Sequence, residues 1–100
     1  MPQAEQGDVL KVSSFHCPVV VVSKNFFNES GMVLACPLLP DATPGPLRIG
    51  FRGNKTGGYV YCEQLRTVDL NVRRFSKVDA VPYLEMIDII DAIQSIFDYV

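Results

Sequence analysis

The chain has 100 residues, of which 48% are hydrophobic and 20% are charged, and its formal net charge is -2. This composition excludes a disordered tail and is typical of one globular domain, here residues 1–100, with a core that needs no disulfide or metal. No apolar run approaches the roughly 20 residues of a membrane span, and the N-terminus lacks a signal-peptide pattern. We therefore expect a cytoplasmic protein with no membrane contact.

The predicted elements begin with short strands. Residues 8–14 predict a first strand, and Pro18 ends the turn that follows it, because proline lacks a backbone donor. The β-branched run at residues 19–22 is typical of a strand buried on both faces. The polar segment 23–31 then predicts a connection, and residues 32–36 predict the next strand.

The middle of the chain predicts a loop followed by a hairpin. Four prolines in residues 37–46 predict a surface loop that cannot join a sheet. In residues 47–52, apolar and other residues alternate, so a strand would direct its apolar side chains to the core and Arg48 and Arg52 to one solvent face. Residues 53–58 have the composition of a hairpin turn.

The C-terminal half predicts further strands and then a helix. Residues 59–69 begin with an apolar, β-prone triplet and continue with many hydrogen-bonding side chains, and the period of two extends to residue 73. Apolar residues then recur at spacings of three and four, which predicts an amphipathic helix over residues 81–97, with Pro82 in its first turn. Many short strands without helices between them predict a small twisted barrel or a strongly bent sheet.

Charge is distributed unevenly along the chain. Residues 48–77 contain seven basic and two acidic side chains, a balance of +5, whereas residues 79–100 contain five acidic side chains and no basic one. A local basic surface on an acidic protein can hold a polyanion.

The residue types exclude several kinds of site. Cys17, Cys36 and Cys62 are odd in number and widely spaced, so we expect reduced thiols and no zinc motif. We predict no cofactor and no bound metal, because the sequence has no phosphate-binding glycine loop or nucleophile motif. The remaining groups suit RNA cleavage without a metal, which needs a base for the 2′-hydroxyl, an acid for the leaving oxygen and cations for the phosphorane.

One segment resembles a known family. Residues 63–69, Glu-Gln-Leu-Arg-Thr-Val-Asp, are similar to the Asp-Gln-x-Arg-Thr-Ile-Asp signature of the MazF/PemK/Kid toxins. The resemblance extends over nearly the whole chain, through Gly7-Asp8-Val9-Leu10, Pro18 to Ser23, Cys36-Pro37-Leu38 and Gly58 to Cys62. It implies a mainly β fold with a C-terminal helix, a small SH3-like barrel of the MazF/PemK/CcdB type.

The resemblance also implies a function and partners. Such proteins are growth-inhibiting toxins that act as metal-independent, sequence-specific endoribonucleases on single-stranded mRNA. They form homodimers and are held inactive by a cognate acidic antitoxin, and they contact operator DNA only through that antitoxin.

Several positions depart from the family pattern. Cys17 stands where the family has an arginine before the proline of the second strand. Residues 39–40 are Leu-Pro in place of a threonine-serine pair, so Thr43 would have to supply the hydroxyl. Tyr61 and Glu63 stand where Kid-like members have arginine and aspartate.

These positions lead to the predicted site. We expect Glu63 to act as general base and Tyr61 or His16 as proton donor. The residues expected to bind RNA are Arg48, Arg52, Lys55, Arg66 and Thr43. The structural alternative is that Tyr61 and His16 only pack and that Arg66 pairs with Asp69.

Two other functions remain open. The first is inhibition of gyrase, because residues 91–97 are similar to the terminal helix of CcdB-like proteins. The second is a catalytically inert module that binds an antitoxin and helps it to repress its own operator.

Overall fold

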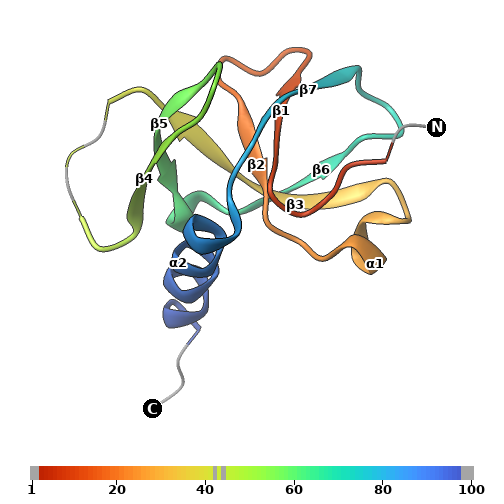
Figure 1. Cartoon of the computed structure of the whole chain (residues 1–100). Coiled ribbons are helices and arrows are strands. Elements are labelled where there is room, and N and C mark those ends of the chain that lie inside the picture. The colour runs from red at the N-terminus through yellow and green to blue at the C-terminus, as the bar shows by residue number, and fades with distance from the viewer. Residues whose placement is uncertain (1–2, 42, 44, 98–100) are drawn as a thin grey trace.

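In this computed structural model, the described residues are 3–41, 43 and 45–97, and they form seven strands, two α-helices and one 3-10 helix (Figure 1). The strands are β1 (Asp8–Val12), β2 (Val19–Val21), β3 (Met32–Leu39), β4 (Arg48–Arg52), β5 (Gly57–Tyr61), β6 (Arg66–Asp69) and β7 (Phe75–Ala80). The helices are α1 (Asn25–Asn28), η1 (Cys62–Gln64) and α2 (Tyr83–Ser95).

The strands form one antiparallel, strongly bent sheet in the order β4-β5-β3-β2-β1-β7. β3 organises it, because β6 pairs with residues 32–35 of β3 and β5 pairs with residues 38–39. η1 lies between β5 and β6 and lets the chain turn where it passes from one pairing to the other. The result is a half-barrel with the β4–β5 hairpin on one side and α1 on the opposite side (Figure 1).

Two apolar clusters fill the two faces of this sheet. One contains Val20, Leu38 and Val60 with the buried face of α2, and the other contains Leu10, Val21 and Val33 with Val68 of β6. Side chains alternate between the clusters along each central strand, as the pleat requires. The prediction that the β2 segment is buried on both faces is confirmed, since its three valines are at most 2% exposed.

The C-terminal helix is confirmed, with shorter bounds than predicted. α2 buries Met86, Ile89, Ala92 and Ile93, which recur at spacings of three and four, and it packs against β4 and η1. Pro82 is its extended N-cap residue and lies outside the first turn. Leu84 and Ile87, two apolar residues of the predicted helix, are 71% and 39% exposed.

The predicted loop over residues 37–46 was wrong at its start. β3 continues through Pro37 to Leu39, and Pro37 pairs with Val19. A proline removes only its own donor, and the next amide, Leu38 N–H, donates to the carbonyl of Pro18 at 2.9 Å. The strand therefore tolerates this proline.

Two further elements differ from expectation. The predicted connection 23–31 contains the single turn α1, held by the buried Asn28 side chain, which donates to the carbonyls of Ala4 and Ser23. β7 was not predicted, because its burial does not alternate cleanly and a bulge interrupts its pairing with β1 between Val9 and Leu10.

The cysteines carry free thiols, as expected. Burial raises the pKa of Cys36 to about 12 and that of Cys62 to about 11, so these two remain protonated core thiols. Within the described part of the chain, no helix combines the length and apolar character needed to cross a membrane.

Candidate functional site

The site is carried by the β4–β5 hairpin, whose two faces differ. Phe51 and Val60 are buried and belong to the core cluster that includes α2. The other face presents the pairs Arg48 with Tyr61, Gly50 with Tyr59 and Arg52 with Gly57. The predicted alternation of residues 47–52 is therefore confirmed, and it places both arginines on the outward face.

η1 brings an acid beside this face. The turn buries Cys62 completely, and the next residue, Glu63, is directed outward. Glu63 Oε2 accepts hydrogen bonds from Arg48 Nη2 at 2.6 Å and from Arg48 Nε at 3.0 Å. A residue of the hairpin and a residue of the signature segment thus form one ion pair.

Tyr61 completes the cluster. The Arg48 guanidinium lies over the Tyr61 ring, 4.0 Å from its centroid. Tyr61 Oη donates to the carbonyl of Asp41 at 3.0 Å, and Arg48 Nη1 donates to the carbonyl of Thr43 at 3.2 Å. Thr43 therefore contacts the site through its backbone oxygen. We call Arg48, Tyr61 and Glu63 the Arg48 cluster.

The ion pair sets the protonation states in the Arg48 cluster. The hydrogen bonds from Arg48 lower the pKa of Glu63, and Glu63 in turn raises the pKa of Arg48. Glu63 is therefore ionised at neutral pH. A carboxylate that is ionised and partly exposed can accept a proton from a bound substrate.

His16 lies in a different place. It lines a hollow of about 390 Å³ with Lys11, Cys17 and Lys55. Among the described residues, no hydrogen bond or ion pair joins His16 to Glu63 or Tyr61. The structure thus brings Tyr61 and Glu63 together, while His16 and Lys55 share a separate hollow.

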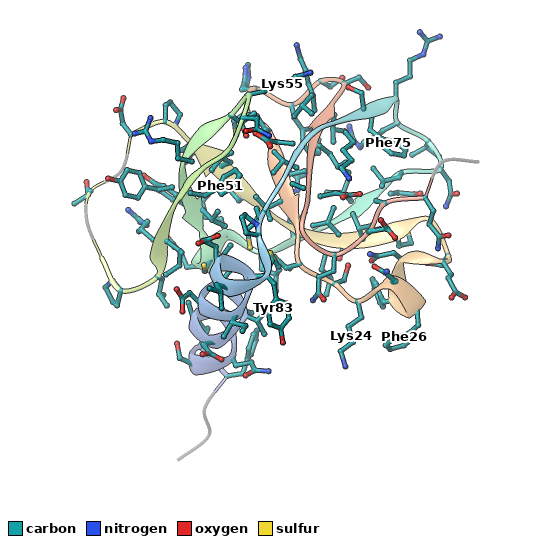
Figure 2. The ribbon with its side chains drawn as sticks, viewed as in Figure 1. Lys24, Phe26, Phe51, Lys55, Phe75 and Tyr83 are labelled. Carbon is teal, nitrogen blue, oxygen red and sulfur yellow. The ribbon has the colours of Figure 1, made fainter. Side chains whose placement is uncertain are left out.

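Lys55 lies at the tip of the hairpin (Figure 2). Asp79, which was not predicted from the sequence, anchors the backbone of this tip. Asp79 Oδ2 accepts from Lys55 N at 2.9 Å, from Thr56 N at 3.0 Å and from Thr56 Oγ1 at 3.0 Å. These donors, the Lys55 amide foremost, hold the pKa of Asp79 well below its usual range. In the sequence, Asp79 is only the first residue of the acidic C-terminal block.

Arg66 takes part in a second cluster. Its guanidinium lies 4.5 Å from the centroid of the Phe15 ring, and that of Arg73 lies 5.0 Å from the same centroid. Asp69 instead accepts a hydrogen bond from the Asn71 amide. No ion pair between Arg66 and Asp69 occurs among the described residues, since residues three apart on a strand point to opposite faces. We call Phe15, Arg66 and Arg73 the Phe15 cluster.

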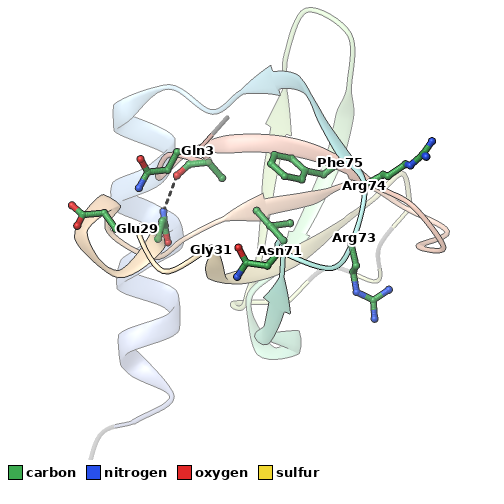
Figure 3. A pocket seen from close by; sticks show the side chains of 10 residues that line it. Gln3, Glu29, Gly31, Asn71, Arg73, Arg74 and Phe75 are labelled. Atoms are coloured by element: carbon green, nitrogen blue, oxygen red, sulfur yellow. Dashed lines mark hydrogen bonds between the residues drawn. The ribbon is translucent and has the colours of Figure 1, made fainter. Parts of the chain in front are cut away.

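A further hollow, of about 490 Å³, lies between α1 and the turn that joins β6 to β7. Asn71, Arg73, Arg74 and Phe75 contribute to its wall, and the guanidinium ends of Arg73 and Arg74 extend away from the other labelled side chains (Figure 3). In the described ranges, no group of three or more His, Cys, Asp or Glu side chains is arranged to hold a metal ion.

Known structures resemble this fold closely. The chain is similar to a MazE-MazF complex from Deinococcus radiodurans, with a TM-score of 0.87 and 20% identity over 96% of this chain and 97% of that one. It is similar to an endoribonuclease from a mycobacterial species, with a TM-score of 0.83 and 21% identity over 95% and 91% of the two chains.

A third structure, a mycobacterial endoribonuclease in complex with its cognate antitoxin, has a TM-score of 0.77 and 18% identity over 100% of both chains. These likenesses confirm the expected fold class, a mainly antiparallel β half-barrel with a C-terminal helix.

No curated protein sequence matches the chain. The family model of the PemK-like, MazF-like toxins of type II toxin-antitoxin systems matches residues 6–97. Since this match spans almost the whole sequence, the chain belongs to that toxin family.

Proposed function

We propose that this toxin is a metal-independent endoribonuclease that cleaves single-stranded mRNA at specific sequences and so inhibits growth. One observation carries the proposal. The Arg48 cluster holds an ionised carboxylate, a phenol and a guanidinium within hydrogen-bonding or stacking distance on one exposed face. These are the groups that transfer of an RNA phosphoryl group requires.

The chemistry follows from these groups. Glu63 takes the proton of a ribose 2′-hydroxyl, and the resulting oxygen attacks the adjacent phosphorus. The bond from phosphorus to the 5′-oxygen breaks, and that oxygen receives a proton from Tyr61. Arg48 stabilises the negative charge of the phosphorane. The products are a 2′,3′-cyclic phosphate and a free 5′-hydroxyl, so atoms and charge balance without a metal.

His16 is the second candidate for the proton donor. It is exposed and lies with Lys55 and Lys11 at a separate hollow, which gives it basic neighbours. In this arrangement a substrate strand would have to reach from the Arg48 cluster to that hollow. Arg52, Lys55, Arg66 and Thr43 are the residues we propose to contact RNA outside the reacting group.

We also propose the partners that the family membership implies. These are a second copy of the chain, a cognate acidic antitoxin and, through that antitoxin only, operator DNA, all in the cytoplasm. The support is that the similar structures include a MazE-MazF complex and an endoribonuclease bound to its antitoxin. The +5 balance of residues 48–77 gives an acidic antitoxin a surface of opposite charge.

Purified protein, freed of its antitoxin, tests the function. We expect it to cleave single-stranded RNA in the presence of EDTA and to leave fully 2′-O-methylated RNA intact, because the attacking hydroxyl is blocked. Phe26→Ala is the matched control, since Phe26 is 74% exposed on α1, on the opposite side of the molecule from the hairpin. Intact RNA would contradict the proposal. Inhibition of gyrase supercoiling with intact RNA would favour the gyrase function instead, and antitoxin binding with neither activity would favour the inert module.

A further inference from the structure

We propose that Tyr59 and Arg52 form a base-stacking subsite for single-stranded RNA on the outward face of the β4–β5 hairpin. The proposal rests on the proposed function. It adds a contact that holds the nucleotide next to the one that reacts at the Arg48 cluster.

The register of the hairpin places these residues in line. Tyr59 and Tyr61 are two residues apart on β5 and therefore share a face, as do Arg48 and Arg52 on β4. One step of two residues along a strand is about 7 Å. The Tyr59 ring thus lies one such step from the ring that carries Arg48.

The two tyrosines differ in how they are covered. The Tyr61 ring is covered by the Arg48 guanidinium, so it positions Arg48 and offers no open face on that side. Tyr59 is paired with Gly50, which has no side chain, and Tyr59 is 40% exposed. A Cβ atom at Gly50 would lie 3.7 Å from Tyr59 Cε2, in ordinary van der Waals contact. Gly50 therefore places no side chain against the partly exposed Tyr59 ring, whereas a larger residue at this position would lie against it.

The surroundings of Tyr59 fit a nucleotide. Tyr59 and Arg52 line an open hollow of about 760 Å³, together with Gly50, Gly57 and Asp41. This volume is within the range of small-molecule sites. Arg52 lies at the end of the face towards Lys55, whereas Asp41 lies at the other end, where its carbonyl accepts from Tyr61.

The basic side chains near Tyr59 favour a negatively charged ligand. Arg52 can neutralise a phosphate at one end of the face, while the charge of Arg48 is offset by Glu63 until substrate enters. An aromatic ring with an open face beside arginines is how proteins bind single strands without reading base edges. The face therefore fits single-stranded RNA with a base against Tyr59.

Binding of an uncleavable RNA tests this subsite. The probe is a fluorescently labelled, fully 2′-O-methylated decamer of adenosine, with affinity measured by anisotropy. We expect Tyr59→Ala to weaken binding by about 5- to 150-fold, the range for loss of one stacked base. Tyr59→Phe should bind within about twofold of the original chain, because the ring and not the hydroxyl makes the contact.

Gly50→Val is the second variant. It tests whether RNA needs access to the Tyr59 ring, because it leaves the ring in place and puts a side chain against it. Its Cβ fits without displacing backbone, and valine is favoured in strands, so the fold should persist while the side chain covers Tyr59. We expect weaker RNA binding, whereas Phe26→Ala should bind unchanged.

Unchanged RNA affinity in both Tyr59→Ala and Gly50→Val would overturn the subsite, even if the RNA is cut and Glu63→Gln abolishes cutting. Weaker binding of a poly-glutamate decamer with unchanged RNA binding would also overturn it and would assign the face to an acidic protein partner. If the unsubstituted chain neither binds nor cuts RNA, the subsite and the proposed function both fail.

Discussion

Two clusters on this toxin place guanidinium groups over aromatic rings, and they differ in what accompanies the cation. In the Arg48 cluster, one arginine stands over Tyr61 and is paired with Glu63 at 2.6 Å. In the Phe15 cluster, Arg66 and Arg73 share one ring, and no ion pair to either arginine occurs among the described residues. An aromatic ring can therefore position a cation in either cluster, but among the described residues only the Arg48 cluster places a carboxylate base beside the cation.

The difference also has an electrostatic consequence. Because Glu63 offsets the charge of Arg48, the Arg48 cluster is close to neutral. We therefore expect it to contribute to RNA cleavage more than to the general attraction of RNA. The Phe15 cluster carries two positive charges, so it attracts any polyanion. This attraction weakens as the salt concentration rises. Substitutions can separate these two contributions.

The largest effect is expected for Glu63→Gln. The amide keeps the size of the side chain but cannot accept the 2′-hydroxyl proton, so we expect RNA cleavage to fall by about 10²- to 10⁴-fold. The thermal midpoint should change little, because the lost ion pair is on the surface. Single-turnover cleavage rates and thermal unfolding of the same preparations measure both. Cleavage that stays within a few-fold of the original rate would show that Glu63 is not the base.

A pair of variants decides the proton donor. Tyr61→Phe keeps the ring beneath Arg48 but removes the hydroxyl, so we expect a loss of about 10²-fold or more in the cleavage rate with unchanged RNA affinity. His16→Ala should cut at nearly the original rate, because His16 lies at a separate hollow. The reverse ranking of the two rates would transfer the acid role to His16.

Asp79 links the hairpin that carries the Arg48 cluster to β7, and its titration predicts a pH dependence of stability. The folded pKa of Asp79 lies below its unfolded value of about 3.9. Its stabilising contribution is therefore present above that pH and is lost as the pH falls through the folded pKa.

We expect Asp79→Asn to lower the thermal midpoint at pH 7 and to lose this difference from the original chain as the pH falls below about 4. Differential scanning calorimetry at several pH values measures it. Asp69→Asn is the control, because within the described part of the chain the Asp69 side chain accepts a hydrogen bond only from the nearby Asn71 amide. A difference independent of pH would contradict the role given to the Asp79 charge.

The smallest effect is expected at the Phe15 cluster. Arg66→Gln or Arg73→Gln should weaken single-stranded RNA binding by only a few-fold and reduce the slope of log affinity against log salt by about 0.7 per lost phosphate contact. The rate of cleavage of bound RNA should not change. Salt titrations with the 2′-O-methylated decamer measure the slope. An unchanged slope in both variants would show that the Phe15 cluster does not contact RNA phosphates.

Much of the fold could be predicted from local patterns. The β-branched run of β2 and the three-and-four spacing of α2 are strong signals, because burial on one or both faces leaves a periodic trace in the sequence. β7 leaves no such trace, since it pairs on one edge only and is interrupted by a bulge. Pro37 misled the prediction, because whether a strand tolerates a proline depends on its partners, which the sequence does not show.

The candidate site could be predicted only in part. Tyr61 and Glu63 lie two residues apart, so their proximity follows from the local sequence. The pairing of Arg48 with Glu63 depends on the β4–β5 register and on the turn of η1. The anchoring role of Asp79 depends on backbone amides of a distant turn, and the open ring of Tyr59 depends on a glycine across the hairpin.

The central claim is that the Arg48 cluster cleaves RNA without a metal ion. The most direct measurement is mass spectrometry of the products formed from a defined single-stranded RNA in EDTA, by the original chain and by Glu63→Gln. We expect fragments ending in a 2′,3′-cyclic phosphate from the original chain and almost none from the variant. Intact RNA in both reactions, or the same fragments at the same rate in both, would contradict the claim.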